Sequence, residues 1–215
     1  GVLEGLPLGL EDNIMGPGSV IDYGNPFVTM ALPHADPDPY HFNIIWKSRV
    51  NWMPMASIRR VTNSSTVRLF AFDVPGLSTD NCYGIRIRKD DLREYWLEFR
   101  QSVPDNRWSS RGILINSQGS PSGDSGAYLL DATPGTPSAN SGYDDAFLPV
   151  GSTFSDKLEG IHITPLHVGT TGNAQWIDVR INLGPLAGNI PPLLAVRADR
   201  TNAAMGEEVT FLATG

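Results

Sequence analysis

Alternation of apolar and polar residues dominates the middle of the chain. From residue 56 onward, short runs repeat with a period of two, which is the spacing of a strand with one buried face. Eight runs of this kind are predicted as strands: residues 57–61, 66–72, 83–88, 95–100, 112–115, 128–130, 160–163 and 175–181. Short strands separated by turn-forming residues indicate an antiparallel β-sandwich over residues 54–184, in a chain that is mostly β.

One earlier segment has a helical period instead. Asp38 and Pro39 are a typical N-cap and first helical residue, and Pro54 ends the run. The apolar residues at helical spacing, expected to share one face, are Phe42, Ile45, Trp46 and Val50. Residues 1–35 lack a steady period and are expected to form an irregular loop after a helical turn at the start.

The last part of the chain departs from the sandwich pattern. Residues 185–192 are rich in Gly and Pro and are predicted to be a linker. Two further apolar runs follow within residues 193–215. Because two strands cannot bury an apolar face by themselves, this end is expected to need a partner, either further polypeptide or a neighbouring subunit.

Several segments resemble a known peptidase family. Tyr23-Gly24-Asn25-Pro26-Phe27-Val28-Thr29-Met30 is similar to the Met-turn of the gametolysin-like metallopeptidases, a metzincin group, and residues 41–52 resemble the helix after it. Residues 95–100, 112–115 and 129–135 resemble parts of the family's β-domain. The resemblance implies that residues 1–53 are a remnant of a metzincin C-terminal subdomain, with Met30 in the Met-turn.

Residues 206–215, Gly-Glu-Glu-Val-Thr-Phe-Leu-Ala-Thr-Gly, are similar to an opening strand of a polycystic-kidney-disease (PKD) type Ig-like module. The resemblance implies that residues 193–215 are the first strands of such a module. The chain is therefore expected to begin and end within recognisable units.

The zinc motif of the metzincin family is degenerate in this chain. In the family it reads H-E-x-x-H-x-x-G-x-x-[HD]. With its Gly at Gly9, the third ligand falls on Asp12, but Val2 and Leu6 take the places of the two His, and Leu3 replaces the general-base Glu. A catalytic zinc needs three protein ligands and one open position. Zinc catalysis by this chain is therefore not expected, although the resemblance leaves enzyme activity an open question.

The composition of the chain limits the kinds of partner and environment that are expected. The chain has 215 residues and a net charge of −7, which disfavours nucleic acid and anionic membranes as partners. Cys82 is the single cysteine, so no intrachain disulfide can form. No run is long and apolar enough for a transmembrane helix. An extracellular, bacterial protein is the expectation that fits both this composition and the resemblance.

Candidate metal ligands are scattered. Asp12, His34, Asp36, Asp38 and His41 are candidates for a metal, with a solvated, capping loop as the alternative. Calcium is a further expectation, and its candidate ligands are Asp80, Asn81, Asp90, Asp91, Asp131, Asp144 and Asp145. His162 and His167 are five residues apart, so they are expected on opposite faces of one strand unless a bulge near Pro165 intervenes.

Two further motifs could be functional but also have ordinary structural explanations. Gly123-Asp124-Ser125-Gly126 copies a serine-protease signature but lacks a partnered general base, so a loop is expected. An exposed platform of aromatic residues could stack on sugars, and the candidates are Tyr95, Trp96, Trp108 and Trp176. Aromatic residues on alternating strands usually belong to the core, so Trp108, in a polar loop, is the best candidate.

These patterns favour a non-catalytic, extracellular structural or interaction segment derived from a secreted metallopeptidase. Assembly with a protein partner or with further copies by strand addition is expected. Two alternatives stay open: a fragment of an active secreted zinc metallopeptidase, and a carbohydrate-binding β-sandwich module.

Overall fold

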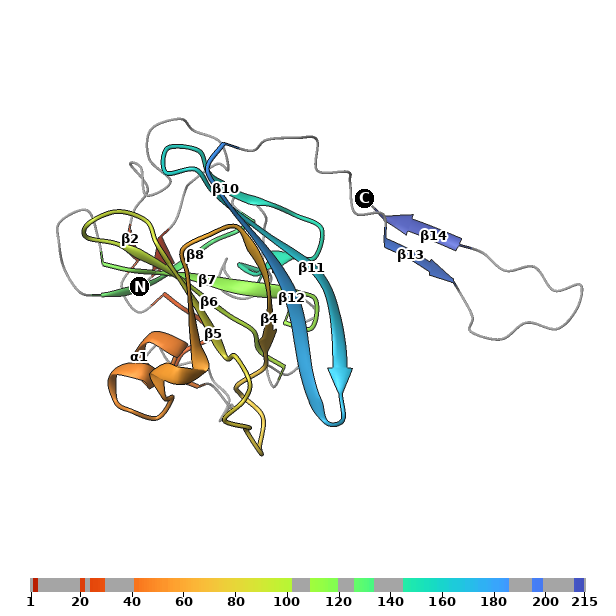
Figure 1. The fold of residues 1–215 in the computed structure, drawn as a ribbon, viewed down its shortest axis with the longest axis horizontal. Helices are drawn as coiled ribbons and strands as arrows, with labels where there is room; N and C mark the ends of the chain where they lie inside the picture. Colours follow the sequence, from red (N-terminus) through yellow and green to blue (C-terminus); the bar gives the residue numbers. More distant parts are fainter. Residues whose placement is uncertain are drawn as a thin grey trace, which may run out of the picture.

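The computed structural model describes residues 2–3, 20–21, 24–29, 41–101, 109–119, 126–133, 145–185, 195–198 and 211–214. Over these ranges the chain is mostly β, with two packed sheets, one short α-helix and a separate strand pair (Figure 1). The predicted class, a mostly β chain with a sandwich-like arrangement, is confirmed.

The first sheet contains eight strands. In spatial order they are β2 (Val20–Ile21), β1 (Val2–Leu3), β8 (Ala127–Leu130), β7 (Gly112–Gln118), β6 (Glu94–Glu98), β5 (Gly84–Arg88) and β3 (Ile58–Val61), with β9 (Leu148–Pro149) also paired to β7. The β1–β8 and β3–β5 pairs are parallel, so the strictly antiparallel expectation is wrong for this sheet. A parallel pair needs a crossover, and between β3 and β5 the chain passes through the second sheet.

The second sheet is antiparallel and has four strands. Their order is β10 (Phe154–Asp156), β11 (Ile161–Thr171), β12 (Ala174–Leu183) and β4 (Ser65–Phe70). All eight runs predicted from alternation lie in strands of the two sheets. The pattern missed β1, β2, β9 and β10, because a strand of two or three residues is too short to show a period of two.

A register shift in β11 changes the placement of two histidines. The shift lies between Pro165 and His167 and leaves one extra residue in β11. His162 therefore pairs with Asn182 and His167 with Asp178, positions four residues apart on β12 and so on one face. The exception stated for a bulge near Pro165 therefore applies, and the two histidines share one face of the sheet.

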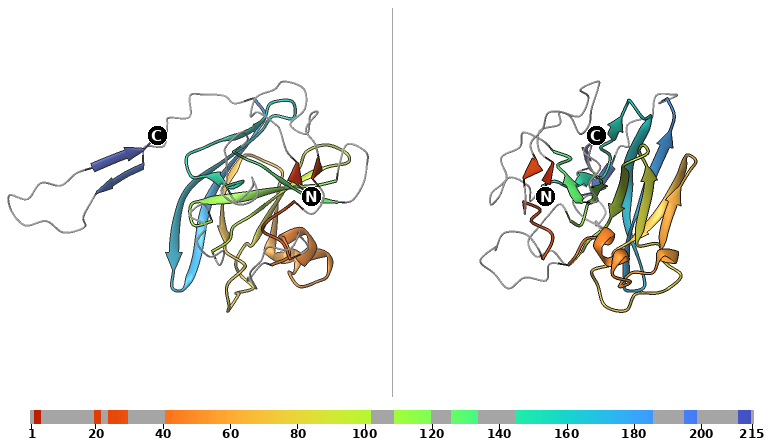
Figure 2. Two further views of the ribbon diagram at one scale, coloured as in Figure 1. Left: turned by 180° about the vertical axis from the view of Figure 1, so that it is seen from behind. Right: turned by 90° about the vertical axis from the view of Figure 1, so that its left-hand side faces the viewer.

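The principal core lies between the two sheets. It contains Leu69, Ile163 and Ile177 from the second sheet and Ile87 and Leu97 from the first, all essentially buried. The opposite face of the first sheet is covered as well. Ile44 and Ile45 of α1 pack near Trp96, and Phe27 packs near Leu114 and Phe147. In Figure 2, α1 (orange) lies away from the blue strands of the second sheet, so the first sheet is the middle layer.

The helix is shorter than predicted. α1 spans Ile44–Arg49, and the Asn43 side chain caps it by accepting a hydrogen bond from the Trp46 N–H at 3.0 Å. The predicted start at Asp38 and Pro39 is wrong, because residues 41–43 are not helical; those two residues lie outside the described ranges. Asn43 begins the helix because its side-chain oxygen satisfies a free N–H of the first turn.

The helix ends where predicted, before Pro54, with Asn51 in the left-handed region at φ 58°. Its predicted buried face is only partly right. Ile45 is buried, but Trp46 and Val50 are exposed, because α1 contacts the sheet through Ile44, Ile45 and Ser48.

The amino-terminal strands belong to the first sheet. Val2 pairs with Leu129 in β8 and with Ile21 in β2, so the helical turn expected at the start is wrong at Val2–Leu3. Nearby Gly5 and Pro7 both disfavour a helix, whereas strand pairing satisfies the backbone groups. The described parts of residues 2–53 therefore pack on the predicted sandwich rather than beside it.

The final strand pair stands apart in Figure 1. β13 (Ala195–Ala198) and β14 (Phe211–Thr214) pair only with each other among the described residues. The two strands expected here are present. The resemblance to a PKD-type module stays a prediction.

Two ion pairs are buried, one on the first sheet and one between the two sheets. Lys89 with Asp156, and Glu98 with Arg100, have side chains that are each 1% exposed. A buried charge is costly unless it is paired and hydrogen-bonded, so both pairs constrain what surrounds them.

Candidate functional site

Exposed apolar side chains are concentrated at α1 and the turn after it. Trp46, Val50, Trp52 and Met55 are 40%, 50%, 65% and 48% exposed, and we call them the aromatic corner. The rings of Trp52 and Phe42 meet edge to face, with centroids 5.5 Å apart. The other large apolar residues exposed in the described ranges, Leu77, Leu92 and Leu158, lie in three separate turns.

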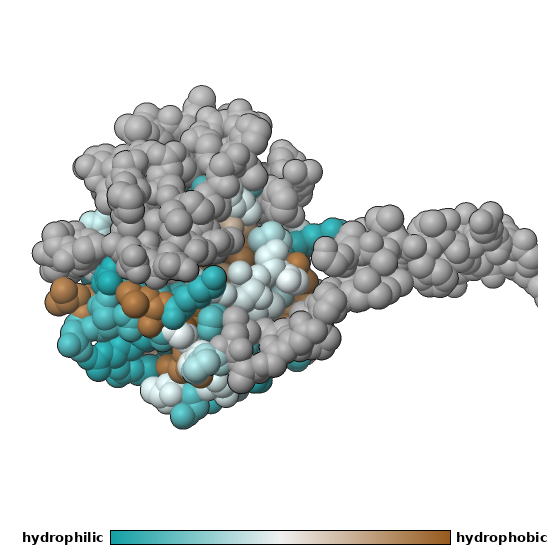
Figure 3. Space-filling model, turned by 90° about the horizontal axis from the view of Figure 1, so that it is seen from above, coloured by the Kyte–Doolittle hydropathy of each residue, from teal (hydrophilic) through white to brown (hydrophobic). Residues whose placement is uncertain are grey.

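Figure 3, seen from above, shows small hydrophobic patches separated by hydrophilic residues on the described surface. Scattered apolar residues are normal on any protein, whereas several within ten residues indicate an interaction surface.

The segment that carries the aromatic corner is basic in sequence. Residues 41–72 contain Lys and Arg but neither Asp nor Glu. Lys47 and Arg49 lie on α1, and Arg59 and Arg60 are exposed on β3, the terminal strand of the first sheet. The Arg49 guanidinium lies 4.7 Å from the centre of the Trp46 ring. The corner is therefore both apolar and cationic, in a chain whose net charge is −7.

Beneath the corner, three basic side chains surround Phe72. The Lys47 ammonium lies 4.7 Å from the centre of the Phe72 ring and donates a hydrogen bond to His41 Nδ1 at 3.0 Å. Burial, followed by the charges of Lys47 and Arg100, lowers the pKa of His41. Burial and Arg100 also lower the pKa of Lys47. His41 is therefore neutral at pH 7, and its Nδ1 accepts the hydrogen bond from the Lys47 ammonium.

This contact bears on the metal candidates. The Nδ1 atom of His41 is engaged by Lys47, while Asp12, His34, Asp36 and Asp38 lie outside the described residues. Within the described ranges, no three His, Cys, Asp or Glu side chains form a group that could hold a metal ion.

The Glu98–Arg100 pair anchors the corner to the first sheet. Arg100 Nε donates to Glu98 Oε1 at 2.9 Å, and Glu98 Oε2 accepts from the Ile44 N–H at 2.7 Å. A carboxylate at this position interacts favourably with the helix N-terminus. Arg100 also donates to the carbonyl groups of Phe27 and His41. One buried pair thus fixes β6, α1 and the Phe27 turn together.

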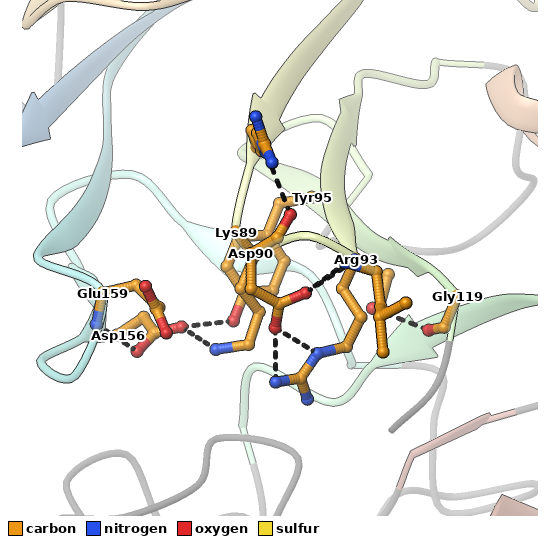
Figure 4. A network of polar contacts seen from close by, with 10 residues as sticks. Lys89, Asp90, Arg93, Tyr95, Gly119, Asp156 and Glu159 are labelled. Atoms are coloured by element: carbon orange, nitrogen blue, oxygen red, sulfur yellow. Dashed lines mark hydrogen bonds and ion pairs between the residues drawn. The ribbon is translucent and has the colours of Figure 1, made fainter. Parts of the chain in front are cut away.

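The Lys89–Asp156 pair joins the two sheets (Figure 4). Lys89 follows β5, and its Nζ contacts Oδ2 of Asp156, the last residue of β10. Tyr95 OH donates to the same Oδ2 at 2.7 Å, and the Glu159 N–H donates to Oδ1 at 3.2 Å. Burial, then the charge of Asp156, raises the pKa of Tyr95 well above its usual value. The phenol therefore keeps its proton.

The three strand aromatics among the platform candidates belong to the core, as expected for alternating strands. Tyr95, Trp96 and Trp176 are buried, and Trp108 lies outside the described residues. The Arg68 guanidinium lies 3.5 Å from the centre of the Trp176 ring, which also covers Gly169. Among the described residues, the large aromatic side chains that are exposed are Trp46 and Trp52. In the sequence, both residues lie in a segment that contains two Trp and no acidic residue, and this feature could have identified them.

Several of the calcium candidates contact other protein groups where they are described. Asp90 pairs with Arg93, and Asp91 pairs with Arg88. Thr133 connects the other group, because its N–H donates to Asp131 and its hydroxyl donates to the Asp145 carbonyl at 2.7 Å. Asp144 lies outside the described residues, and calcium binding stays a prediction.

Further predictions concern residues that lie wholly or partly outside the described ranges. Met30 lies outside them, as do the first three residues of the Gly123–Gly126 motif. The carbonyl of Gly126 accepts from the Gly119 N–H at 2.9 Å. No helix in the described ranges is long and apolar enough to cross a membrane.

In comparisons with known proteins, no protein-family model, curated protein or solved structure matches the chain. The gametolysin-like and PKD-type resemblances therefore stay predictions. Function has to be argued from the geometry of the described surface.

Proposed function

We propose that this chain is a non-catalytic interaction module that associates with further copies of itself through the aromatic corner. The observation that carries the proposal is the exposure of Trp46, Val50, Trp52 and Met55 within one basic segment. Aromatic residues flanked by Arg are enriched at the energetic centres of protein interfaces.

A second copy is the occupant that the charges favour. Residues 41–72 carry five of the 16 Lys and Arg and none of the 23 Asp and Glu. All the acidic residues of a copy therefore lie outside this segment, and the exposed ones among those described, such as Asp80 and Glu159, can face the corner of another copy. Such a head-to-tail contact is attractive electrostatically and weakens with salt.

The free edges of the sheets support the same association. β3 is the last strand of the first sheet, and β13 and β14 pair only with each other among the described residues. Unpaired strand edges accept strands from other chains. The resemblance to secreted peptidases supports an extracellular, bacterial setting for this assembly, and the degenerate zinc motif supports a role without catalysis.

The test is sedimentation velocity over a range of protein and salt concentrations. We expect wild-type oligomers that dissociate as salt rises, and a Trp52→Ser variant whose association is weaker by about 30-fold or more. Leu158→Ser is the matched control, because Leu158 is 61% exposed in the turn after β10. It should associate like the wild type.

A wild type that stays monomeric at all concentrations would overturn the proposal. The same variants then test the carbohydrate alternative, for which the exposed rings of Trp46 and Trp52 are the supporting observation. Retention on an insoluble polysaccharide that Trp52→Ser abolishes, with a monomeric wild type, would establish that alternative instead.

A further inference from the structure

The cluster of Lys89, Asp156 and Tyr95 contains the two reactants of an amide bond. An amine and a carboxyl group are held in contact, and each side chain of the pair is 1% exposed. The Tyr95 and Phe154 rings meet edge to face beside them, with centroids 5.4 Å apart. The site is thus dry and fixed, conditions under which a desolvated lysine is a good nucleophile.

The hydrogen bonds on Asp156 distinguish its two oxygens. Oδ1 accepts from the Glu159 N–H at 3.2 Å, so a backbone donor faces the oxygen on which negative charge would develop during attack. Oδ2 accepts from Lys89 and from the Tyr95 hydroxyl at 2.7 Å. A hydroxyl that keeps its proton therefore contacts the oxygen that would have to leave.

We propose that Lys89 and Asp156 form an intramolecular isopeptide bond between Nζ and Cγ. The reaction needs no other reactant. A proton first moves from the ammonium to Oδ2 within their hydrogen bond, which gives a neutral amine and a carboxylic acid. The nitrogen lone pair then attacks Cγ, and the carbonyl electron pair moves to Oδ1.

The intermediate collapses with loss of water. As the electron pair on Oδ1 returns, the Cγ–Oδ2 bond breaks. Oδ2 already carries one proton, and it receives a second from the Tyr95 hydroxyl, which regains a proton from Nζ. One molecule of water leaves, and Tyr95 is unchanged. Fixed proximity replaces the collision that two free molecules would need.

The bond would tie together the turn after β5 and the end of β10, which belong to different sheets. The linked residues are 67 positions apart. Such a cross-link restricts the unfolded chain in the way a disulfide does, and it needs no oxidant. Glu98 and Arg100 cannot react in this way, because a guanidinium stays protonated and is no nucleophile.

The test is the intact mass of the purified, denatured wild-type chain. We expect a mass lower than the sequence mass by one water molecule, and a branched proteolytic peptide that joins Lys89 to Asp156. No such peptide should join Glu98 to Arg100. A cyclised aspartate also loses water, but it opens in mild alkali, whereas the isopeptide persists.

Variants then assign the roles. Lys89→Arg and Asp156→Ala should each show the full sequence mass, and Tyr95→Phe should react about 100-fold more slowly or worse and so leave a fraction at full mass. A folded wild type that keeps the full sequence mass after prolonged incubation would overturn the proposal. That result does not depend on whether any variant folds.

Discussion

The two buried ion pairs are equally inaccessible but connect different parts of the molecule. Glu98 and Arg100 lie two residues apart, and their further hydrogen bonds go to α1 and to the Phe27 turn, on the outer side of the first sheet. Lys89 and Asp156 come from different sheets and lie within the sandwich. Equal burial therefore does not imply an equal role: one pair positions the covering layer, and the other joins the two sheets.

The largest effect should come from removing Glu98. Glu98→Ala leaves Arg100 buried without its partner and removes the acceptor for the Ile44 N–H. We expect a loss of about 3–5 kcal/mol in the free energy of unfolding, measured by urea denaturation. Replacing both residues by apolar ones should recover much of this loss. A single-variant loss below about 1 kcal/mol would contradict the anchoring role.

Tyr95→Phe should have a smaller effect at the other pair. It removes one hydrogen bond to Asp156. Wild type and variant are compared with the Lys89–Asp156 cross-link in the same state, as judged by intact mass. The expected loss in unfolding free energy is about 1–3 kcal/mol. Tyr83→Phe is a matched control, since Tyr83 OH accepts from Ser78 N–H in a partly buried turn. An equal loss in both variants would argue against a special role for the Asp156 cluster.

Acidification should separate the two regions further. Burial lowers the pKa of both His41 and His162, so below pH 6.5 the unfolded chain takes up protons that the folded chain does not. Stability is therefore lost as pH falls from roughly 7 to 5.

Besides burial, Lys47 and Arg100 lower the pKa of His41 while Asp73 raises it, and for His162 the Gly184 backbone and Asp156 raise the pKa while Lys157 lowers it. His41→Asn and His162→Asn should each flatten the pH profile of the unfolding midpoint. A profile that neither variant changes would contradict the lowered pKa values as its cause.

The smallest effect on the free energy of unfolding is expected at an exposed ion pair. Arg68 and Asp178 form a bidentate pair at 2.9 and 3.0 Å on the open face of the second sheet. Asp178→Asn should change the unfolding free energy by less than about 1 kcal/mol, because solvent screens exposed pairs. A loss as large as that of Glu98→Ala would show that burial is not what distinguishes the pairs.

The sequence allowed the strands to be predicted but not what lies on the first sheet. A period of two identified all eight longer strands, since each has a face in the principal core. It also made Glu98 and Arg100 look like outward-facing polar positions. They are buried because α1 and the Phe27 turn form a third layer, and no local pattern reports such tertiary cover.

The second buried pair was beyond sequence reasoning for a different reason. Lys89 is 67 residues from Asp156, which ends a strand of only three residues. Neither the pairing of distant turns nor so short a strand leaves a periodic signal. The aromatic corner does not follow from the sequence, because helical spacing places Trp46 and Val50 on one face with Ile45, whereas α1 contacts the sheet through Ile44, Ile45 and Ser48.

The strand order has a consequence for synthesis on the ribosome. Val2 pairs with Leu129, and Ser65 pairs with Ile181. The earliest strand must therefore wait for β8, and β4 must wait for β12, which at about 5–20 residues per second means several seconds with an unpaired edge. The second sheet is complete only after β12 has been synthesised. Nascent chains of this protein should accordingly depend on holding chaperones, and truncation before β12 should yield aggregates rather than a smaller folded unit.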